Sequence, residues 1–328
     1  MGNTIGWGIL ATGWIAELFV TDLKLNGHSV VAVGSRTQTT ADRFAKTFDI
    51  ARAHGSYEAL VTDPDVDIVY VATPHTHHLA AARLALSAGK HVLLEKPFTV
   101  NAQEAAEIVV LARNNGLIVL EAMWTRFLPH MHRIREIIAA GVIGDIRSIT
   151  ADHRLKLSDD PKHRLNALEL GGGALLDLGI YPISFAWDIL GEPASVQATA
   201  VFRDSGADAQ VATIFQYGSG AVVTTLSSSD SAGPNRASVV GTKGRIEIDR
   251  VWYSPCRFRV YDNENNLVED YDGSVPGRGM QFQAEEAERL ISEGLISGET
   301  MPPSQSVQIM ATLDEVRRLI GLKYPGEV

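Results

Sequence analysis

Short apolar runs alternate with helical patterns through the first third of the chain, and this alternation restricts the fold more than any other feature. The runs are apolar along their whole length, which is typical of parallel strands covered by helices on both faces. We therefore predict an α/β fold that begins with a doubly wound parallel sheet. The expected strands are Ile5–Leu10, Ser29–Gly34, Val66–Ala72, His91–Glu95 and Leu117–Glu121.

After Trp124 the rhythm changes to β-rich runs separated by short turns, such as the one from Tyr217 to Gly220. Strands joined in this way favour hairpins and an antiparallel sheet. Helical patterns are expected near 174–190, 280–293 and 307–322. Because a chain of 328 residues exceeds what one core usually supports, we predict two domains. Residues 1–123 form the parallel-sheet domain, and 124–328 form an α+β domain with a large, mostly antiparallel open sheet.

Composition excludes several classes of protein. The chain has 29 basic and 39 acidic residues and a formal net charge of −10, so it offers no basic surface for nucleic acid. Its one cysteine, Cys256, cannot form an internal disulfide, which fits a reducing compartment. No uncharged apolar run reaches the ~18 residues of a membrane crossing. We expect a cytoplasmic protein with no nucleic-acid or membrane partner.

The segment after the first strand has the spacing of a dinucleotide-binding turn, with alanine at the first glycine position. Small residues allow the backbone to approach a pyrophosphate, and the amides that open the next helix bind it. An ordinary strand-to-helix turn is the alternative interpretation. The residues predicted to contact the cofactor here are Ala11, Thr12, Gly13, Trp14 and Ile15.

Ser35 and Arg36 follow the second strand, where an NAD-selective site would place a carboxylate for the ribose hydroxyls. A guanidinium at this position suits a 2′-phosphate, because it is always charged and offers a planar fork of donors. We predict NADP as the cofactor, with NAD as the second choice. The alternative is a solvent-exposed arginine at the start of a helix, with no binding role.

Glu95, Lys96 and Pro97 stand at the end of the strand 91–95. The carboxyl ends of strands line the ligand crevice of a doubly wound sheet, so the Lys96 ammonium is expected to face the cofactor. The alternative is a surface lysine paired with Glu95. The Lys96–Pro97 peptide bond is a candidate for the cis form.

Together with four stretches distributed over nearly the whole chain, these residues resemble the Gfo/Idh/MocA oxidoreductases. The stretches are Ala11–Gly13, Ala72–His78, Ala88–Pro97 and Gly171–Tyr181. A fifth, Glu121–Phe127, resembles a branch with dimeric dihydrodiol dehydrogenases and NADP-dependent D-xylose dehydrogenases. The resemblance implies an N-terminal Rossmann domain that binds NAD(P), and a C-terminal domain that binds substrate and forms a homodimer or a higher homo-oligomer.

The resemblance also implies roles for individual residues. Lys96 matches the catalytic lysine, Tyr181 the acid/base position, and Asp177 the acidic residue one helical turn earlier. Independently, Asp177 and Tyr181 are four residues apart and therefore share a helix face. A buried tyrosine with a capping aspartate is the alternative. The further cofactor residues are Thr73, Pro74, His75, His78, Glu95, Lys96, Trp124 and Arg126, and the substrate residues are Lys96, Trp124, His153, Asp177 and Tyr181.

The implied activity is hydride transfer between NADP and a carbinol of a neutral, polyhydroxylated ring. The substrate is an aldose such as xylose or glucose, or a trans-dihydrodiol. The phenol of Tyr181 would take the hydroxyl proton, aided by the Lys96 ammonium. A non-catalytic NADP-binding sensor is the alternative. A metal-dependent hydrolase rests only on His75, His77 and His78, which lack further ligands in register, so no metal is expected.

Overall fold

The computed structural model describes residues 4–160 and 163–325, in two compact units. Unit 1 comprises Met1–Trp124 and Pro276–Val307, and unit 2 comprises Thr125–Val275 and Gln308–Val328. The predicted division had a single boundary at 123/124, whereas Pro276–Val307 returns to unit 1. The reason lies in helix α8 (Gln281–Glu293), because Glu288 accepts a hydrogen bond from Trp7 Nε1 at 2.7 Å.

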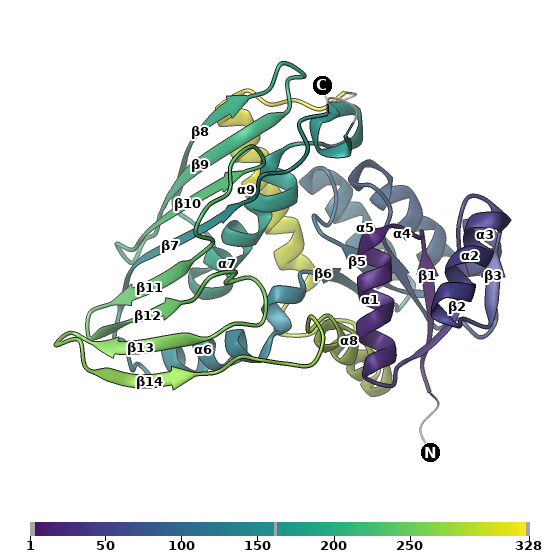
Figure 1. Ribbon diagram of the computed structural model, residues 1–328, viewed down its shortest axis with the longest axis horizontal. Coiled ribbons are helices and arrows are strands. Elements are labelled where there is room, and N and C mark those ends of the chain that lie inside the picture. The colour runs from purple at the N-terminus through teal and green to yellow at the C-terminus, as the bar shows by residue number, and fades with distance from the viewer. Residues whose placement is uncertain (1–3, 161–162, 326–328) are drawn as a thin grey trace. The chain divides into compact units, whose positions relative to one another are not determined.

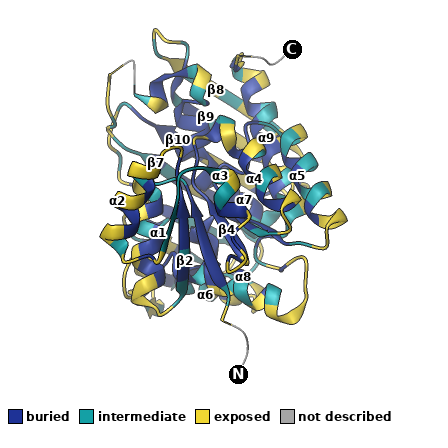
Figure 2. Ribbon diagram, turned by 90° about the vertical axis from the view of Figure 1, so that its right-hand side faces the viewer, coloured by how far each residue is buried: buried dark blue, intermediate teal, exposed yellow. Residues whose placement is uncertain are grey.

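Unit 1 contains the predicted parallel sheet. Its six strands lie in the order β3-β2-β1-β4-β5-β6, and every neighbouring pair is parallel. β1, β4 and β6 are buried along their whole length, and β2 and β4 are largely dark blue in Figure 2. The strands are β1 (Gly6–Leu10), β2 (Ser29–Gly34), β3 (Arg52–His54), β4 (Ile68–Val71), β5 (His91–Glu95) and β6 (Val119–Ala122).

Helices follow the strands of unit 1, as the sequence predicts. Polar side chains cap three of them, since Thr37, Ser56 and Asn101 each accept from a backbone N–H of the first turn. Helix α1 begins after Gly13 with no side-chain cap. The helices of unit 1, besides α8, are α1 (Trp14–Leu25), α2 (Gln38–Phe48), α3 (Tyr57–Val61), α4 (His78–Ser87) and α5 (Ala102–Asn114).

Unit 2 is built on an eight-stranded open sheet (Figure 1). The order is β14-β13-β12-β11-β7-β10-β9-β8, and only the β10–β7 pair is parallel. The predicted hairpin turn at Tyr217 joins β9 to β10, which confirms the antiparallel reading. The strands are β7 (Ile146–Arg154), β8 (Ser195–Phe202), β9 (Asp208–Gln216), β10 (Val222–Ser228), β11 (Ala237–Gly241), β12 (Gly244–Ile248), β13 (Phe258–Asp262) and β14 (Leu267–Tyr271).

The expected helix near 174–190 is two elements in the structure. A π-helical turn, η5 (Leu175–Gly179), leads directly into α7 (Ile180–Leu190), and both pack on β7 and β10. The described stretch Leu168–Leu190 is long and apolar enough to cross a membrane, but 83% of its most apolar window is buried inside the protein, as in a core helix. The other long helices are α6 (Pro129–Ala139) and α9 (Pro303–Ile320), which belongs to unit 2 from Gln308 onward.

Candidate functional site

The turn after β1 keeps the backbone shape of a dinucleotide-binding loop although alanine replaces its first glycine. Ala11 has φ +81°, a left-handed conformation that costs a non-glycine residue about 1 kcal/mol or more. Its N–H donates to the carbonyl of Gly34 at 3.0 Å, which ties the turn to β2. A Cβ at Gly13 would meet nothing within 4 Å, so the space before the uncapped start of α1 is open. Thr12, Trp14 and Ile15 complete a turn that fits a pyrophosphate.

The end of β2 supplies the second anion-binding feature of unit 1. Ser35 is buried, and its N–H donates to the carbonyl of His54 at 3.1 Å. Arg36 is exposed and pairs with no carboxylate in the described part of the chain. A guanidinium held at this strand end in solvent is available for a 2′-phosphate. Unit 1 therefore fits NADP at both of the cofactor's anionic groups.

Lys96 projects from a strand end whose backbone is held by buried carboxylates. Glu95 accepts from the Lys96 N–H at 3.1 Å, and Tyr70 donates its hydroxyl to the other oxygen of the same carboxylate. Glu121 accepts from the N–H of Phe98 at 3.2 Å. The Lys96–Pro97 bond is cis, as the sequence suggested. Lys96 itself is half-buried.

His78 joins the two loops that carry the predicted cofactor residues of β4 and β5. Its Nδ1 lies 2.9 Å from the carbonyl oxygen of Pro97, and its Nε2 lies 2.9 Å from that of Thr73. Complete burial lowers the pKa of His78 to about 4, helped by the charge of Lys96. The ring is therefore neutral at physiological pH and donates to one of the two carbonyls at a time. Its predicted contact with cofactor stays a prediction.

In unit 2, an aromatic cluster surrounds the predicted acid/base residue. The ring centroids of His153 and Tyr181 are 4.9 Å apart, and those of His153 and Tyr253 are 3.8 Å apart and stacked. Tyr181 and Tyr253 are separated by 5.4 Å. The carbonyl of Tyr253 accepts from the Thr125 hydroxyl at 2.6 Å, which fixes that residue in place. Sequence reasoning missed Tyr253, because it follows β12 without any motif around it.

Asp208 holds the start of the helix that carries Asp177 and Tyr181. Its Oδ2 accepts from the N–H of Leu175 at 2.6 Å, and a Cβ at Gly173 would lie 1.9 Å from its Oδ1. Only glycine therefore fits there, and its φ is +137°. Burial raises the pKa of Asp208 to about 6, against the lowering effect of the backbone donors. Sequence reasoning missed this residue too.

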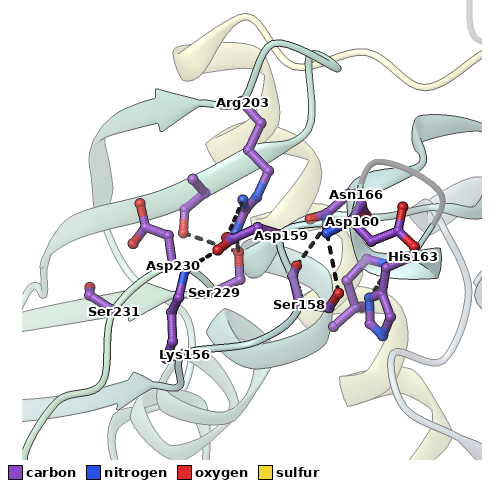
Figure 3. A network of polar contacts seen from close by, with 12 residues as sticks. Lys156, Ser158, Asp159, Asp160, His163, Asn166, Arg203, Ser229, Asp230 and Ser231 are labelled. Atoms are coloured by element: carbon purple, nitrogen blue, oxygen red, sulfur yellow. Dashed lines mark hydrogen bonds and ion pairs between the residues drawn. The ribbon is translucent and has the colours of Figure 1, made fainter.

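The loop between β7 and η5 brings a cation to Asp177. Arg164 Nη2 lies 3.4 Å from Asp177 Oδ1, and the Asp177 side chain is largely buried. Figure 3 shows the contacts of this loop: Arg203, after β8, donates to Asp159 at 3.2 Å, and Asn166 donates to the loop's own carbonyls of Ser158 and Asp160 at 2.8 and 2.7 Å. Arg164 is thus a residue beside the site that no sequence motif marked.

The remaining predicted residues, Trp124, Arg126 and His75, are all buried, but their contacts differ. Trp124 is buried at the end of unit 1. Arg126 is buried in unit 2 and donates to Ser184 Oγ at 2.9 Å and to the Ser184 carbonyl at 2.6 Å, which is a packing contact with α7. His75 is buried with its ring centroid 5.8 Å from that of His78. Among the described residues, no group of three metal-ligating side chains is placed to hold an ion.

The predicted catalytic residues divide between the units. Lys96 belongs to unit 1, whereas His153, Asp177 and Tyr181 belong to unit 2. Each set is brought together within its own unit. That the ammonium of Lys96 meets the phenol of Tyr181 stays a prediction.

Comparisons with known proteins agree with one another. The family described as "Oxidoreductase family, NAD-binding Rossmann fold" matches residues 5–123, and the "GFO/IDH/MocA C-terminal domain" matches residues 131–247. The chain is 38% identical over 331 residues to trans-1,2-dihydrobenzene-1,2-diol dehydrogenase of Mus musculus, with 98% of each chain covered. It is 36% identical over 369 residues to D-xylose 1-dehydrogenase (NADP(+)) of Hypocrea jecorina, covering 98% of this chain and 93% of that one.

Solved structures give the same fold. A 3-ketoreductase from Actinomadura kijaniata in complex with NADP and TDP-benzene matches with a TM-score of 0.85 and 27% identity, covering 97% of this chain and 98% of that one. An aldose-aldose oxidoreductase from Caulobacter crescentus matches with a TM-score of 0.88 over 97% of each chain. At 24% identity, this second likeness concerns the fold alone.

Proposed function

Since the chain belongs to the Gfo/Idh/MocA oxidoreductase family, we propose that it moves a hydride between NADP and a ring carbinol of a sugar or a dihydrodiol. The observation that carries this proposal is that the backbone of Lys96 is fixed by a buried carboxylate in the same unit as a turn that fits NADP. Two dehydrogenases, 36 and 38% identical to nearly the whole chain, act by name on D-xylose and on a dihydrodiol.

We propose that three side chains handle the proton of the substrate hydroxyl. NADP, when bound, accepts the hydride from the carbinol carbon. Tyr181 takes the hydroxyl proton, and the Lys96 ammonium favours the phenolate form that can do so. Asp177, held by Arg164 at 3.4 Å, orients Lys96 or the substrate hydroxyl.

The aromatic cluster supports a neutral ring as substrate. The rings of His153, Tyr181 and Tyr253 lie within 5.4 Å of one another and form an amphipathic surface. Such rings contact the apolar C–H face of a sugar or the unsaturated face of a diol, while their polar atoms bind hydroxyls. Trp124 is proposed to contact both substrate and cofactor.

On the cofactor side, we propose that Ala11 to Ile15 bind the pyrophosphate and that Ser35 and Arg36 bind the 2′-phosphate. The residues proposed to line the remainder of the cofactor site are Thr73, Pro74, His75, His78, Glu95, Lys96, Trp124 and Arg126. The sensor alternative is disfavoured, because the relatives reported above are named as dehydrogenases.

The proposal is tested by incubating the purified protein with NADP or NAD and a panel of aldoses, inositols and trans-dihydrodiols. The expected result is NADPH absorbance that rises with an aldose or a dihydrodiol, faster with NADP than with NAD. Binding of NADP without turnover on any member of the panel would favour the sensor. Turnover of inositols alone would contradict the proposed substrates.

We also propose a homodimer or higher homo-oligomer in the cytoplasm. The open face of the unit 2 sheet supports the first point, since it carries a groove of about 510 Å³ lined by β7, β10, β11 and β12. The location is proposed from Cys256, the one cysteine of the chain, which has no partner for an internal disulfide and therefore fits a reducing compartment.

A further inference from the structure

Arg278 lies on a short loop of unit 1 that precedes α8. It is exposed, and it is flanked by Gly277 and Gly279, which have φ values of +70° and +85°. Left-handed backbone on both sides of one residue makes a tight turn that only glycine adopts without strain. No sequence motif marks this arginine, and no role has been given to it above.

A buried carboxylate fixes the backbone of this loop. Asp22 on α1 is 2% exposed, and its two oxygens accept from the N–H of Arg278 at 3.1 and 3.0 Å. Oδ2 also accepts from the N–H of Met280 at 2.9 Å. A Cβ at Gly277 would lie 2.4 Å from Asp22 Oδ1, so the loop sits directly on the carboxylate. The base of the Arg278 side chain is therefore held rigidly against α1.

The side chain of Arg278 extends between two indoles. Its guanidinium carbon lies 5.9 Å from the ring centroid of Trp14 and 5.6 Å from that of Trp124. Trp124 is buried, whereas Trp14 is 68% exposed, which is unusual for so large an apolar side chain. Trp14 is also the first residue of α1, directly after Gly13 of the dinucleotide turn.

Stacking on aromatic rings leaves the hydrogen-bonding edge of a guanidinium available. The contact with an indole uses the flat face of the cation, while its five N–H donors point outward in the plane. Arg278 forms no ion pair with any carboxylate in residues 4–160 and 163–325. The ligand that suits such an edge is a phosphate group, which accepts two parallel bonds from it.

We propose that Arg278 is a cofactor-binding residue that contacts the diphosphate of NADP. NADP carries anionic groups at the diphosphate and at the 2′-phosphate. Trp14 places Arg278 at the dinucleotide turn, where the diphosphate binds, whereas Arg36 stands at the end of β2. Cofactor binding would also cover the exposed indole of Trp14.

The test measures the dissociation constants of NADP⁺, NAD⁺ and 2′-phospho-ADP-ribose by calorimetry for the wild type and for Arg278→Met. Methionine keeps apolar contact with the indoles and removes the charge. We expect all three dissociation constants to rise by about 10- to 100-fold, the value of one charged hydrogen-bonded contact. The rise is equal for the three ligands, because each of them contains the diphosphate.

Arg36→Met is the matched control. It should raise the dissociation constants of NADP⁺ and 2′-phospho-ADP-ribose and leave that of NAD⁺ unchanged, because only the first two ligands carry the 2′-phosphate. Arg278→Lys should recover part of the affinity that methionine loses. Wild-type affinities in Arg278→Met would overturn the proposal. So would a loss confined to NADP⁺ and NAD⁺, which would place Arg278 at the nicotinamide. Because binding is measured without turnover, neither result depends on the roles of Lys96 and Tyr181.

Discussion

At the scale of single residues, the candidate site depends on side chains whose backbones are fixed by buried polar partners. Lys96 is an example, because Glu95 and Glu121 accept the N–H groups on either side of the Lys96–Pro97 bond. His78 contacts the carbonyl of Pro97 from the other loop. The backbone from which the Lys96 side chain extends is therefore fixed by unit 1 before any ligand arrives, which reduces the entropy cost of ordering this loop.

Replacing Lys96 by methionine should slow the reaction and leave the binding of NADP⁺ largely intact. We expect Lys96→Met to lower kcat by about 10²- to 10⁴-fold, because Tyr181 loses the charge that favours its phenolate and proton transfer is impaired. The dissociation constant of NADP⁺ should change much less, because the phosphate contacts are intact. Lys46→Met, at an exposed position on α2, is the control and should behave as the wild type. Normal turnover by Lys96→Met would show that the assigned role is wrong.

The residues that could be predicted from sequence all belong to local motifs. Gly13, Arg36 and Lys96 each stand at a fixed place relative to a strand that the apolar pattern reveals. Arg278 and Asp208 have no such local signal, because their partners, Asp22 and Leu175, lie far away in the chain. Contacts of this kind are made by tertiary folding and leave no periodicity in the sequence.

At the scale of secondary structure, the start of the η5–α7 helix is the element on which the unit 2 site depends. Asp208 accepts from the N–H of Leu175, and Asp177 and Tyr181 follow on the same helix. A π-helical turn at this point, where the i→i+5 bonds widen the helix, is a frequent feature of functional sites. Asp208 is completely buried, so its ionisation affects the stability of the whole helix.

The raised pKa of Asp208 predicts the direction in which the free energy of unfolding changes with pH. Because its pKa is raised from 3.8 to about 6 in the folded protein, the fold favours the protonated carboxyl. This contribution is complete below about pH 3.8 and is lost as the pH rises through about 6. Relative to wild type, Asp208→Asn should therefore gain roughly 3 kcal/mol of unfolding free energy over this interval. Urea unfolding of both proteins across the range measures the difference. A difference in unfolding free energy between the two proteins that stays constant with pH would contradict the prediction.

The elements of unit 1 that the sequence analysis did not predict are a short strand and a short helix. β3 has three half-buried residues, Arg52–His54, at the edge of the parallel sheet, and α3 spans only Tyr57–Val61. Neither is long enough to show a hydrophobic period. The longer elements were predictable, because strands buried on both faces require continuous apolar runs. The order β3-β2-β1-β4-β5-β6 comes from the structure.

At the scale of the whole molecule, the open face of the second sheet suits association with another copy. Ile214, Thr224, Thr150 and Ser238 lie opposite one another on successive strands and form a row across this face. The residues are apolar or small and hydroxylated, with Ile214 42% exposed. A surface of this composition suits packing against the same surface of a second copy in a two-fold arrangement.

Thr224→Arg should disrupt a dimer formed through this face. In a two-fold dimer through this face, the substitution adds a positive charge to both copies within the interface, and charge burial and repulsion there cost several kcal/mol, so we expect the dimer dissociation constant to rise at least ~100-fold. Sedimentation velocity over a range of concentrations measures it. Thr47→Arg, an exposed threonine on α2, is the matched control and should remain dimeric. A monomeric wild type, or a dimeric Thr224→Arg, would contradict the prediction.

The return of Pro276–Val307 to unit 1 has a consequence for how the protein can be divided. A gene shortened after Trp124 would encode every strand of the parallel sheet and still lack α8. The indole N–H of Trp7 would lose its acceptor on Glu288, and the carboxylate of Asp22 would lose the amides that it now binds. Both groups are buried in the whole chain, so a fragment without α8 and the loop before it would lose these hydrogen bonds and expose the surface of α1 that α8 now covers. Unit 1 is thus not encoded by one continuous stretch: its helix α8 follows the whole sheet of unit 2 in the sequence.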